Sequence, residues 1–508
     1  MPNVIINEYD LSTTGIPVYA NFSVVVPGFV KDGKGKYDDD TSVFDENGVY
    51  ECKTQADFEA YIGKFNKEYG AAAPTLYTDA VWTREQTELS EDEPALIKKA
   101  QNAFDAGTLY IATENTDPIG YLHDGQYAYT KATEKPTGQE SISELYSIIK
   151  AGDEGRNGSV HYGNQIAYEL LGLGYTVLYK KLTDISELTD KDSAVAFFAP
   201  LKDKSIYSFR YVLTGLLSGN INANNAISKL ATYENNADYT KSGRGDIIAL
   251  LDVDKNTYIS GATATTIIDN INSFVNSCSD SDKFSAFFAP YVSLNIVDTA
   301  YNNTVLPGSF YYLACAANAF GNLGYNEWWP VAGYERGVSK YTVLGTGYTF
   351  GELAADILQP RHKPDTEQGG AKKAVNLIIK SHGSYYLYGN RTANALEAEL
   401  KFSDFLNIRQ LLATLKKQTY YASKKFTFDP NSSLLWIKFC DAIEPVLKRM
   451  KADEGVEDYK FVRINTKVKA TMKGLIRIVP IEGVEDFKIG INMEDSIKGV
   501  AVNIDELE

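Results

Sequence analysis

Three oxygen-bearing side chains stand at the spacing of a calcium-binding loop. Asp252, Asp254 and Asn256 correspond to the first, third and fifth positions of an EF-hand. That loop also needs glycine at its sixth position, where the chain turns sharply, and a bidentate glutamate at its twelfth. Thr257 and Thr263 stand at those places instead. The spacing therefore predicts no calcium site, and we expect neither a metal nor another cofactor.

Other signals of catalysis are equally incomplete. The glycine-bearing loop at 345–352 lacks the lysine and the serine or threonine with which a P-loop holds phosphate. The Arg-Gly-Asp tripeptide at 244–246 is short enough to occur by chance. The four histidines are dispersed, and the HExxH, CxxC and GxSxG motifs do not occur. Acidic residues are abundant, but no catalytic pair stands out. The sequence predicts a protein that is not an enzyme.

The adjacent tryptophans, Trp328 and Trp329, are the best candidate for a binding platform. A pair of this kind could stack on a carbohydrate, and an aromatic pair also packs at a junction between domains or subunits. We favour packing, and keep a glycan-binding or glycan-active protein as the less favoured alternative.

The composition is typical of a large globular protein with extensive packing surfaces. The 508 residues are 44% hydrophobic, a length and composition that suit about three domains. Thirty-five tyrosines stand against four histidines, and tyrosine suits surfaces that pack against other surfaces. No apolar run approaches the ~20 residues of a membrane span. The first residues lack the pattern of a secretory signal, and four scattered cysteines indicate reduced thiols in a chain made in a cytoplasm.

Charge is distributed unevenly along the chain. The net charge is −16, but residues 401–480 contain sixteen lysines and arginines against eight aspartates and glutamates. Such an excess forms either a solvated basic face or a face turned toward an acidic partner. We favour a protein partner over nucleic acid, because no nucleic-acid-binding module is recognisable.

A C-terminal unit at 401–493 combines two predicted helices with a small sheet. Apolar residues recur at helical spacing on both sides of a turn at Asp429 and Pro430. Residues 431–433 offer N-caps for the second helix, and Pro445 predicts a kink or a shorter helix. Alternating runs predict three strands, at 459–464, 473–480 and 484–493.

The rest of the chain predicts a mixed α/β fold with added parts. Helices alternating with apolar strands between 164 and 350 indicate a partly parallel sheet. The predicted strands are 22–30, 175–182, 193–200, 207–215, 245–253 and 283–290. The predicted helices are 54–70, 89–107, 141–152 and 264–277, with another one before Gly172. The strand-prone ends of the chain predict extended arms, which pair within the subunit or with another molecule.

Several of these stretches, taken together, resemble contractile-tail sheath proteins of myophages and phage-derived injection particles. The resemblance spans most of 160–493 and departs from the family pattern at 463–472. The family-motif positions are Asn407, Arg409, Phe428, Asp429, Pro430, Asn431 and Trp436, with Trp329, Pro330, Gly333, Gly389, Arg391 and Thr392 upstream.

This resemblance implies a layout of five parts. They are an N-terminal arm (1–20), a central α/β sheath domain (21–72 and 159–355), an inserted outer domain (73–158), a C-terminal sheath domain facing an inner tube (356–493) and a C-terminal arm (494–508). The inter-subunit arm strands would contain Val4, Ile5, Ile6, Val500 and Val502, and the tube-facing basic residues would be Arg409, Lys416, Lys417, Lys424 and Lys425.

The resemblance also implies a function. The chain would be a structural subunit of a phage tail sheath, which polymerises around the tail tube and contracts to drive it through the host envelope. Its partners would be other copies of itself, the inner tube protein, and baseplate and tail terminator proteins, with no direct nucleic acid and no membrane insertion. It would be assembled in the host cytoplasm and reside in the virion. Another tail component, of the baseplate or tube, is the main alternative.

Overall fold

The computed structural model describes sixteen segments of the chain. They are residues 22–30, 34–37, 39–63, 75–76, 109–114, 122–124, 127–131, 145–150, 158–183, 186–232, 243–258, 262–296, 305–359, 373–394, 401–464 and 472–481. They belong to two compact units, Met1–Lys425 and Phe426–Glu508, which are described separately. The predicted arms, the helix at 89–107 and the strand at 484–493 lie outside the described residues.

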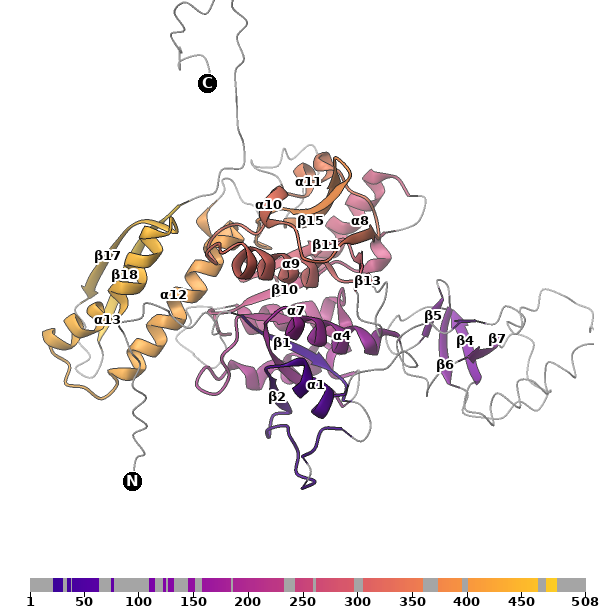
Figure 1. The fold of residues 1–508 in the computed structure, drawn as a ribbon, viewed down its shortest axis with the longest axis horizontal. Coiled ribbons are helices and arrows are strands. Elements are labelled where there is room, and N and C mark those ends of the chain that lie inside the picture. Colours follow the sequence, from indigo (N-terminus) through magenta and orange to yellow (C-terminus); the bar gives the residue numbers. More distant parts are fainter. Residues whose placement is uncertain are drawn as a thin grey trace, which may run out of the picture. The chain divides into compact units, whose positions relative to one another are not determined.

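An eight-stranded mixed sheet organises the first unit (Figure 1). The order is β16-β15-β11-β10-β9-β1-β8-β2, in which the six inner strands are parallel and the two edge strands are antiparallel to their neighbours. The strands are β1 (Ser23–Gly28), β2 (Val49–Cys52), β8 (Thr176–Lys181), β9 (Tyr211–Leu213), β10 (Ile248–Asp252), β11 (Ser285–Ala289), β15 (Val375–Ser381) and β16 (Ser384–Tyr388). This arrangement confirms the predicted partly parallel sheet.

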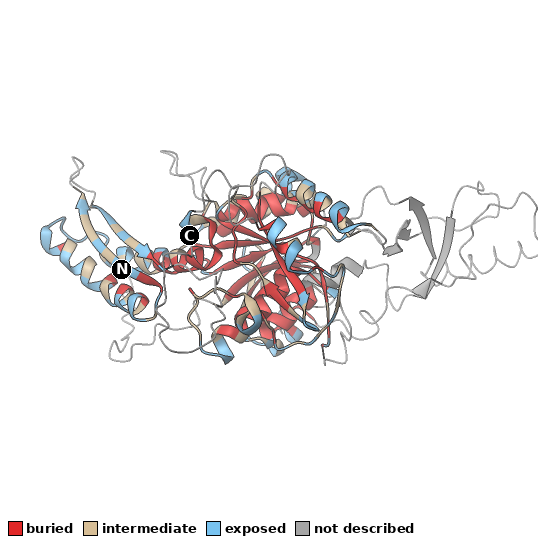
Figure 2. Ribbon diagram, turned by 90° about the horizontal axis from the view of Figure 1, so that it is seen from above, coloured by how far each residue is buried: buried red, intermediate tan, exposed pale blue. Residues whose placement is uncertain are grey.

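The sheet is the middle of three layers. Every residue of β1, β10 and β11 is buried, as expected for strands covered on both faces. Successive side chains point to opposite faces, so Val25 belongs to one apolar cluster while Val24 and Val26 belong to another. Figure 2 shows buried residues throughout the strands and on the inner sides of the helices of this unit.

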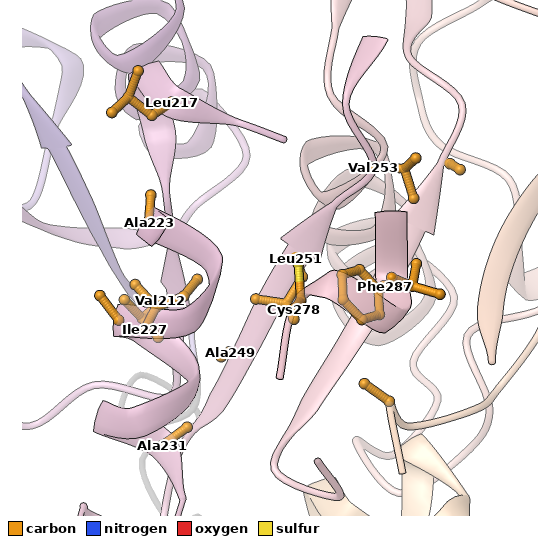
Figure 3. Close-up of a cluster of buried hydrophobic side chains, with 14 of the residues drawn as sticks. Val212, Leu217, Ala223, Ile227, Ala231, Ala249, Leu251, Val253, Cys278 and Phe287 are labelled. Atoms are coloured by element: carbon orange, nitrogen blue, oxygen red, sulfur yellow. The ribbon is translucent and has the colours of Figure 1, made fainter. Parts of the chain in front are cut away.

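Helices α6 (Lys191–Phe198), α7 (Ile221–Ala231), α8 (Ala264–Ser277) and α11 (Glu352–Leu358) supply the cluster that contains Val25. Figure 3 shows Ala223 and Ile227 of α7 on the side of Val212, and Leu251 beside Cys278 and Phe287. The prediction of a helix at 264–277 is confirmed by α8, whose N-cap, Thr263, accepts a hydrogen bond from the Thr266 backbone N–H.

Helices α1 (Gln55–Tyr61), α4 (Gly158–Gly172) and α9 (Gly308–Ala317) supply the opposite cluster, with Leu406 from the start of α12 (Leu406–Lys425). All ten residues of α9 are buried, which explains its run of small and aromatic residues. Thr54 forms the predicted cap of α1 through a capping box with Asp57. The described part of the predicted 54–70 helix is helical only to Tyr61.

Two predicted elements are wrong. The stretch 193–200 is not a strand, because Asp190 accepts hydrogen bonds from the Asp192 and Ser193 backbones and starts helix α6. The stretch 141–152 is not a helix, because Leu145–Lys150 forms strand β7. In both cases a short apolar run suits either structure, and its partners decide the outcome.

Smaller elements complete the first unit. A three-stranded sheet has the order β13-β12-β14, from β12 (Val292–Leu294), β13 (Val305–Leu306) and β14 (Val343–Thr346). An antiparallel sheet has the order β3-β7-β4-β6-β5, from β3 (Thr75–Leu76), β4 (Leu109–Glu114), β5 (Leu122–Asp124), β6 (Tyr127–Lys131) and β7. Single turns are α5 (Ser186–Thr189), α10 (Gly333–Arg336), η3 (Ala199–Lys202), η4 (Gly215–Leu217), η5 (Lys255–Thr257), η6 (Asn318–Asn322) and η8 (Phe402–Asp404).

The second unit contains helix α13 (Ser433–Ala452) and a hairpin of β17 (Val456–Ile464) and β18 (Lys473–Pro480). Ser432 is the N-cap of α13, within the predicted 431–433, and Pro445 lies inside a helix that continues to Ala452. The predicted helix pair and the strands at 459–464 and 473–480 are confirmed. The division between the units falls after Lys425, so α12 packs in the first unit and α13 belongs to the second.

Candidate functional site on helix α12

Two buried asparagines hold the first turn of α12 in place. The Asn407 side chain donates to the Trp328 carbonyl at 3.0 Å and accepts from the Asn390 side chain at 2.7 Å. The Asn407 backbone N–H donates to the Asn390 side-chain oxygen at 3.0 Å. Since each amide is engaged at both ends, the start of α12 is fixed in orientation as well as position.

The link between β16 and α12 depends on two further motif residues. The Arg391 guanidinium lies over the Phe405 ring, 4.5 Å from its centroid, and the Arg391 backbone N–H donates to the Asn376 side chain at 2.8 Å. The Thr392 backbone N–H donates to the Asp404 carbonyl at 2.8 Å. Arg391 and Thr392 therefore position α12, and both are buried.

Gly389 is required by its backbone and by its neighbour. Its φ is +150°, and a Cβ there would lie 2.0 Å from Gln359 Nε2, which donates to the carbonyls of Val375 and Tyr388. Gly389→Ala should lower the free energy of unfolding by about 2 kcal/mol, because it adds backbone strain and displaces that amide. Urea unfolding should show this loss and a near-neutral Gly345→Ala control, where a Cβ meets nothing within 4 Å. Equal stability of the two variants would contradict this role of Gly389.

An excess of cations lies along the inner face of α12. We call this set the α12 seam: Lys204, Arg210, Arg244, Lys283, Arg409, Lys416 and Lys417, with the carboxylates Asp246, Asp282 and Glu327. Seven cations thus face three carboxylates. The seam joins α12 to the chain before β9, β10 and β11 and to the loop that follows η6.

Arg210 is the centre of one half of the seam. Its Nη1 forms an ion pair with Glu327 Oε2 at 2.9 Å and donates to Thr414 Oγ1 at 2.6 Å. Its Nη2 donates to the Gln410 carbonyl at 2.6 Å, and Thr414 Oγ1 donates to Glu327 Oε1 at 2.6 Å. One buried guanidinium therefore connects the chain before β9 to two turns of α12.

The Arg-Gly-Asp tripeptide forms the other half. Arg244 binds Asp246 through two parallel hydrogen bonds of 3.0 and 3.1 Å, and donates to the carbonyls of Leu201 and Tyr207. Both charged residues are buried, so this tripeptide is a structural ion pair and not an exposed adhesion loop. Burial raises the pKa of Asp246, but Arg244 outweighs it, and the net pKa lies below its usual range.

The α12 lysines and arginine donate mainly to backbone carbonyls. Arg409 Nη2 and Lys416 Nζ donate to the Gly245 carbonyl at 3.2 and 3.0 Å, and Lys417 Nζ donates to the Phe209 carbonyl. Arg409 also lies 3.9 Å from the centroid of the Phe284 ring. Burial lowers the pKa of Lys416 and of Lys417 to about 7, and the neighbouring cations add to the effect. Burial lowers the pKa of Arg409 to about 10.

The structure separates the five predicted basic residues into two groups. Arg409 and Lys417 are 4% and 5% exposed, so their charges are directed into the subunit. Lys416 has an exposed stem with its amine on Gly245, and Lys424 and Lys425 are exposed at the end of α12. Burial therefore restricts the proposed contact with another protein to these three lysines.

The motif residues of the second unit have mixed surroundings. Trp436 stacks on Phe439, with ring centroids 5.6 Å apart, and a Cβ on Gly474 would lie 2.2 Å from its ring. Phe428 is fully exposed with φ +76°, in a turn closed by the Asp429 N–H to the Phe426 carbonyl. Pro430 and Asn431 are exposed beside it.

The tryptophan turn is packed within the first unit. Trp328 is buried, and Trp329 lies against Tyr325 and the Arg336 guanidinium, with centroid distances of 5.3 and 5.2 Å. Arg336 also donates to the Pro330 carbonyl at 2.8 Å, and Gly333 has φ +81° at the start of α10. This geometry supports the packing interpretation of the tryptophans.

The calcium-like spacing has a structural explanation. Asp252 Oδ1 accepts from the Ser309 backbone N–H at 2.8 Å, and Oδ2 accepts from Ser309 Oγ at 2.7 Å. The carboxylate thus binds the first turn of α9. Within the described segments, no group of three or more His, Cys, Asp or Glu side chains is placed to hold a metal ion. A search of the same segments finds no helix that is long and apolar enough to cross a membrane.

Sequence reasoning missed most of the seam. Arg210, Arg244, Asp246, Glu327 and Gln410 were not predicted as functional, although Arg210 and Arg244 stand just before apolar strands. A charge directly before a buried strand is a weak signal, since such positions are normally solvated.

No protein-family model matches the chain, and no curated protein matches it. Solved structures are similar to it at low identity. They include a chain of the anti-feeding prophage baseplate (13% identity, 65% of this chain and 79% of that chain, TM-score 0.43) and the PVC sheath complex of an extracellular contractile injection system in the contracted state (13%, 63% and 77%, 0.43). The sheath tail protein of Desulfitobacterium hafniense matches at 11% identity over 94% of this chain and 100% of that chain, with a TM-score of 0.38.

Proposed function

We propose that this chain is the sheath subunit of a contractile tail or tail-like injection particle, built from many copies around an inner tube. The observation that carries the proposal is the convergence of motif residues that are distant in sequence. Asn407 contacts the carbonyl of Trp328, and Arg391 and Thr392 lie on the segment that leads into α12. Four positions identified from the sequence motif thus belong to one structural device, the anchored start of α12.

The three-layer body suits a rigid part in such an assembly. A close-packed core resists continuous deformation, so subunits move as blocks and exchange one set of contacts for another. Energy would be stored in the less favourable interfaces of the extended state, without a nucleotide or a metal. The partners are other copies of the chain, the tube protein, and baseplate and terminator proteins. The particle is a phage virion or an extracellular injection system.

Electron microscopy of the purified protein tests this proposal. Rings or tubes of regular diameter are the expected result, on their own or after mixing with a tube protein. Monodisperse monomers under all conditions would contradict it, and a thin tube without a wider sheath would favour the alternative of a tube component.

The N-terminal arm is proposed to link neighbouring subunits, through a strand that includes Val4, Ile5 and Ile6. Removing residues 1–16 should leave a folded subunit that no longer builds long tubes, because the strand that continues the polymer is gone. Circular dichroism checks the fold and electron microscopy measures tube length. A C-terminal arm containing Val500 and Val502 is proposed to act in the same way. Tubes of normal length and yield from the truncated chain would refute arm exchange.

Lys416, Lys424 and Lys425 are proposed to face an acidic surface of the tube. Charge reversal of Lys424 and Lys425 together should weaken co-sedimentation with the tube several-fold, and added salt should act likewise because exposed charges are screened beyond about 10 Å at ~0.1 M. Lys255→Glu, at another exposed position, serves as the control. Tube binding that ignores both treatments would leave these lysines as a solvated face.

A further inference from the structure

The seam holds α12 with bonds that satisfy donors without neutralising charge. Lys417 is 5% exposed, and the Phe209 carbonyl is the one acceptor of its amine among the described residues. An ammonium group has three donors, so its charged form is poorly satisfied there. Arg409 and Lys416 share a single carbonyl, that of Gly245. A carbonyl accepts a hydrogen bond but carries no net charge to offset the cation.

The groups around the two lysines leave positive charge in excess. Lys417 faces Arg210 from the chain before β9, Arg244 and Asp246 from the chain before β10, and Glu327 from the loop after η6. Both nearby carboxylates are already paired, Asp246 with Arg244 and Glu327 with Arg210.

Lys416 has similar surroundings. It faces Arg409 on its own helix, Lys204 after η3, Asp246, and Lys283 before β11. Asp282, the remaining carboxylate of the seam, faces Arg409. Each proton added to Lys416 or Lys417 therefore meets several cations and no free carboxylate within the seam.

We propose that the α12 seam is a charge-sensitive latch, in which protonation of Lys416 and Lys417 loosens α12 from the sheet and their neutral forms hold it closed. The inference concerns the single subunit and does not depend on the proposed function. Helix α12 ends at Lys425, where the first unit ends, so its release lengthens the tether before the second unit.

The direction of the pH dependence follows from linkage. Both lysines have a docked pKa lowered to about 7, against about 10.4 when exposed. Between those values the released helix binds more protons, so docking strengthens as pH rises and weakens as pH falls toward 7. The equilibrium constant for release should rise about tenfold per lysine for each pH unit lost, and should level off below about pH 7.

Amide hydrogen exchange on the full chain tests the latch. Protection of residues 406–425, corrected for intrinsic exchange, should fall between ~tenfold and ~hundredfold per pH unit from pH 9 to 7.5. The variant Lys416→Met with Lys417→Met should abolish this slope and keep protection high. Lys424→Met with Lys425→Met, at exposed positions of the same helix, should keep the wild-type slope.

A permanently charged variant guards against a trivial loss of fold. Lys417→Arg should lower protection of α12 at every pH and reduce its slope, while protection of β1 and β10 stays high. A wild-type slope in the Lys416→Met, Lys417→Met protein, or pH-independent protection in the wild type, would overturn the latch. Neither result bears on whether the chain assembles into tubes.

Discussion

Replacing Arg210 with methionine is expected to lower the free energy of unfolding by about 3–5 kcal/mol, the range for breaking a buried ion pair from one side. The Arg210 side chain is 1% exposed, and that of its partner, Glu327, is 12% exposed. Methionine replaces the stem but not the charge, so the carboxylate stays in a largely dry position without its cation. The same change removes the donor to the Gln410 carbonyl, which weakens the docking of α12.

Urea unfolding with a double-mutant cycle measures this effect. Adding Glu327→Gln to Arg210→Met should restore part of the loss, because the uncompensated charge is then gone. Lys36→Met is the matched control: Lys36 pairs with Asp40 at 2.8 Å, but their side chains are 59% and 82% exposed. Such a pair contributes at most about 1 kcal/mol. If Arg210→Met cost no more than Lys36→Met, the seam would not hold α12.

Asp252→Asn is expected to stabilise the protein at neutral pH by up to about 3 kcal/mol. Burial raises the pKa of Asp252 to about 6, and the hydrogen bonds from Ser309 oppose this only partly. An asparagine keeps both contacts, since its oxygen accepts from the Ser309 N–H and its amide donates to Ser309 Oγ. The variant therefore resembles the protonated aspartate, which the site prefers.

The pH dependence has a defined sign. The folded pKa of Asp252 lies above the unfolded value of about 3.9, so the folded state binds more protons between those values. The contribution to stability is full below about pH 4 and is lost as pH rises through about 6. Urea unfolding at pH 4.5 and 7.5 should show this loss in the wild type, and a smaller loss in Asp252→Asn. Asp269→Asn, at an exposed position of α8, should keep the wild-type dependence, and a similar change in all three proteins would reject the assignment.

Elements with complete local signals were predicted well. Helix α8 has a capping threonine and an apolar stripe of Ile267, Ile271 and Val275, and its predicted bounds match the structure. Strand β18 also matches, because Ile476 and Ile478 alternate with exposed neighbours. A cap acts within one helical turn and a strand repeats every two residues, so a few neighbouring residues specify these elements.

Elements without a complete local signal were decided by their partners. The apolar run at 193–200 suits a buried strand, but it packs as α6 against α7 in a layer beside the sheet. The run at 145–150 suits an amphipathic helix, but it pairs with β4 and β3. Short apolar runs are compatible with both structures, so pairing and packing choose between them.

The sequence by itself determined the alternation of strands and helices, the caps and the motif positions around Asn407. Only the tertiary structure decided which charges are buried. The basic excess at 401–480 suggested a surface, yet Arg409 donates to Gly245 and Lys417 to Phe209, which lie 164 and 208 residues earlier in the chain. A local sequence pattern reports backbone geometry over a few residues, whereas the burial of a charge depends on partners that folding brings from distant segments.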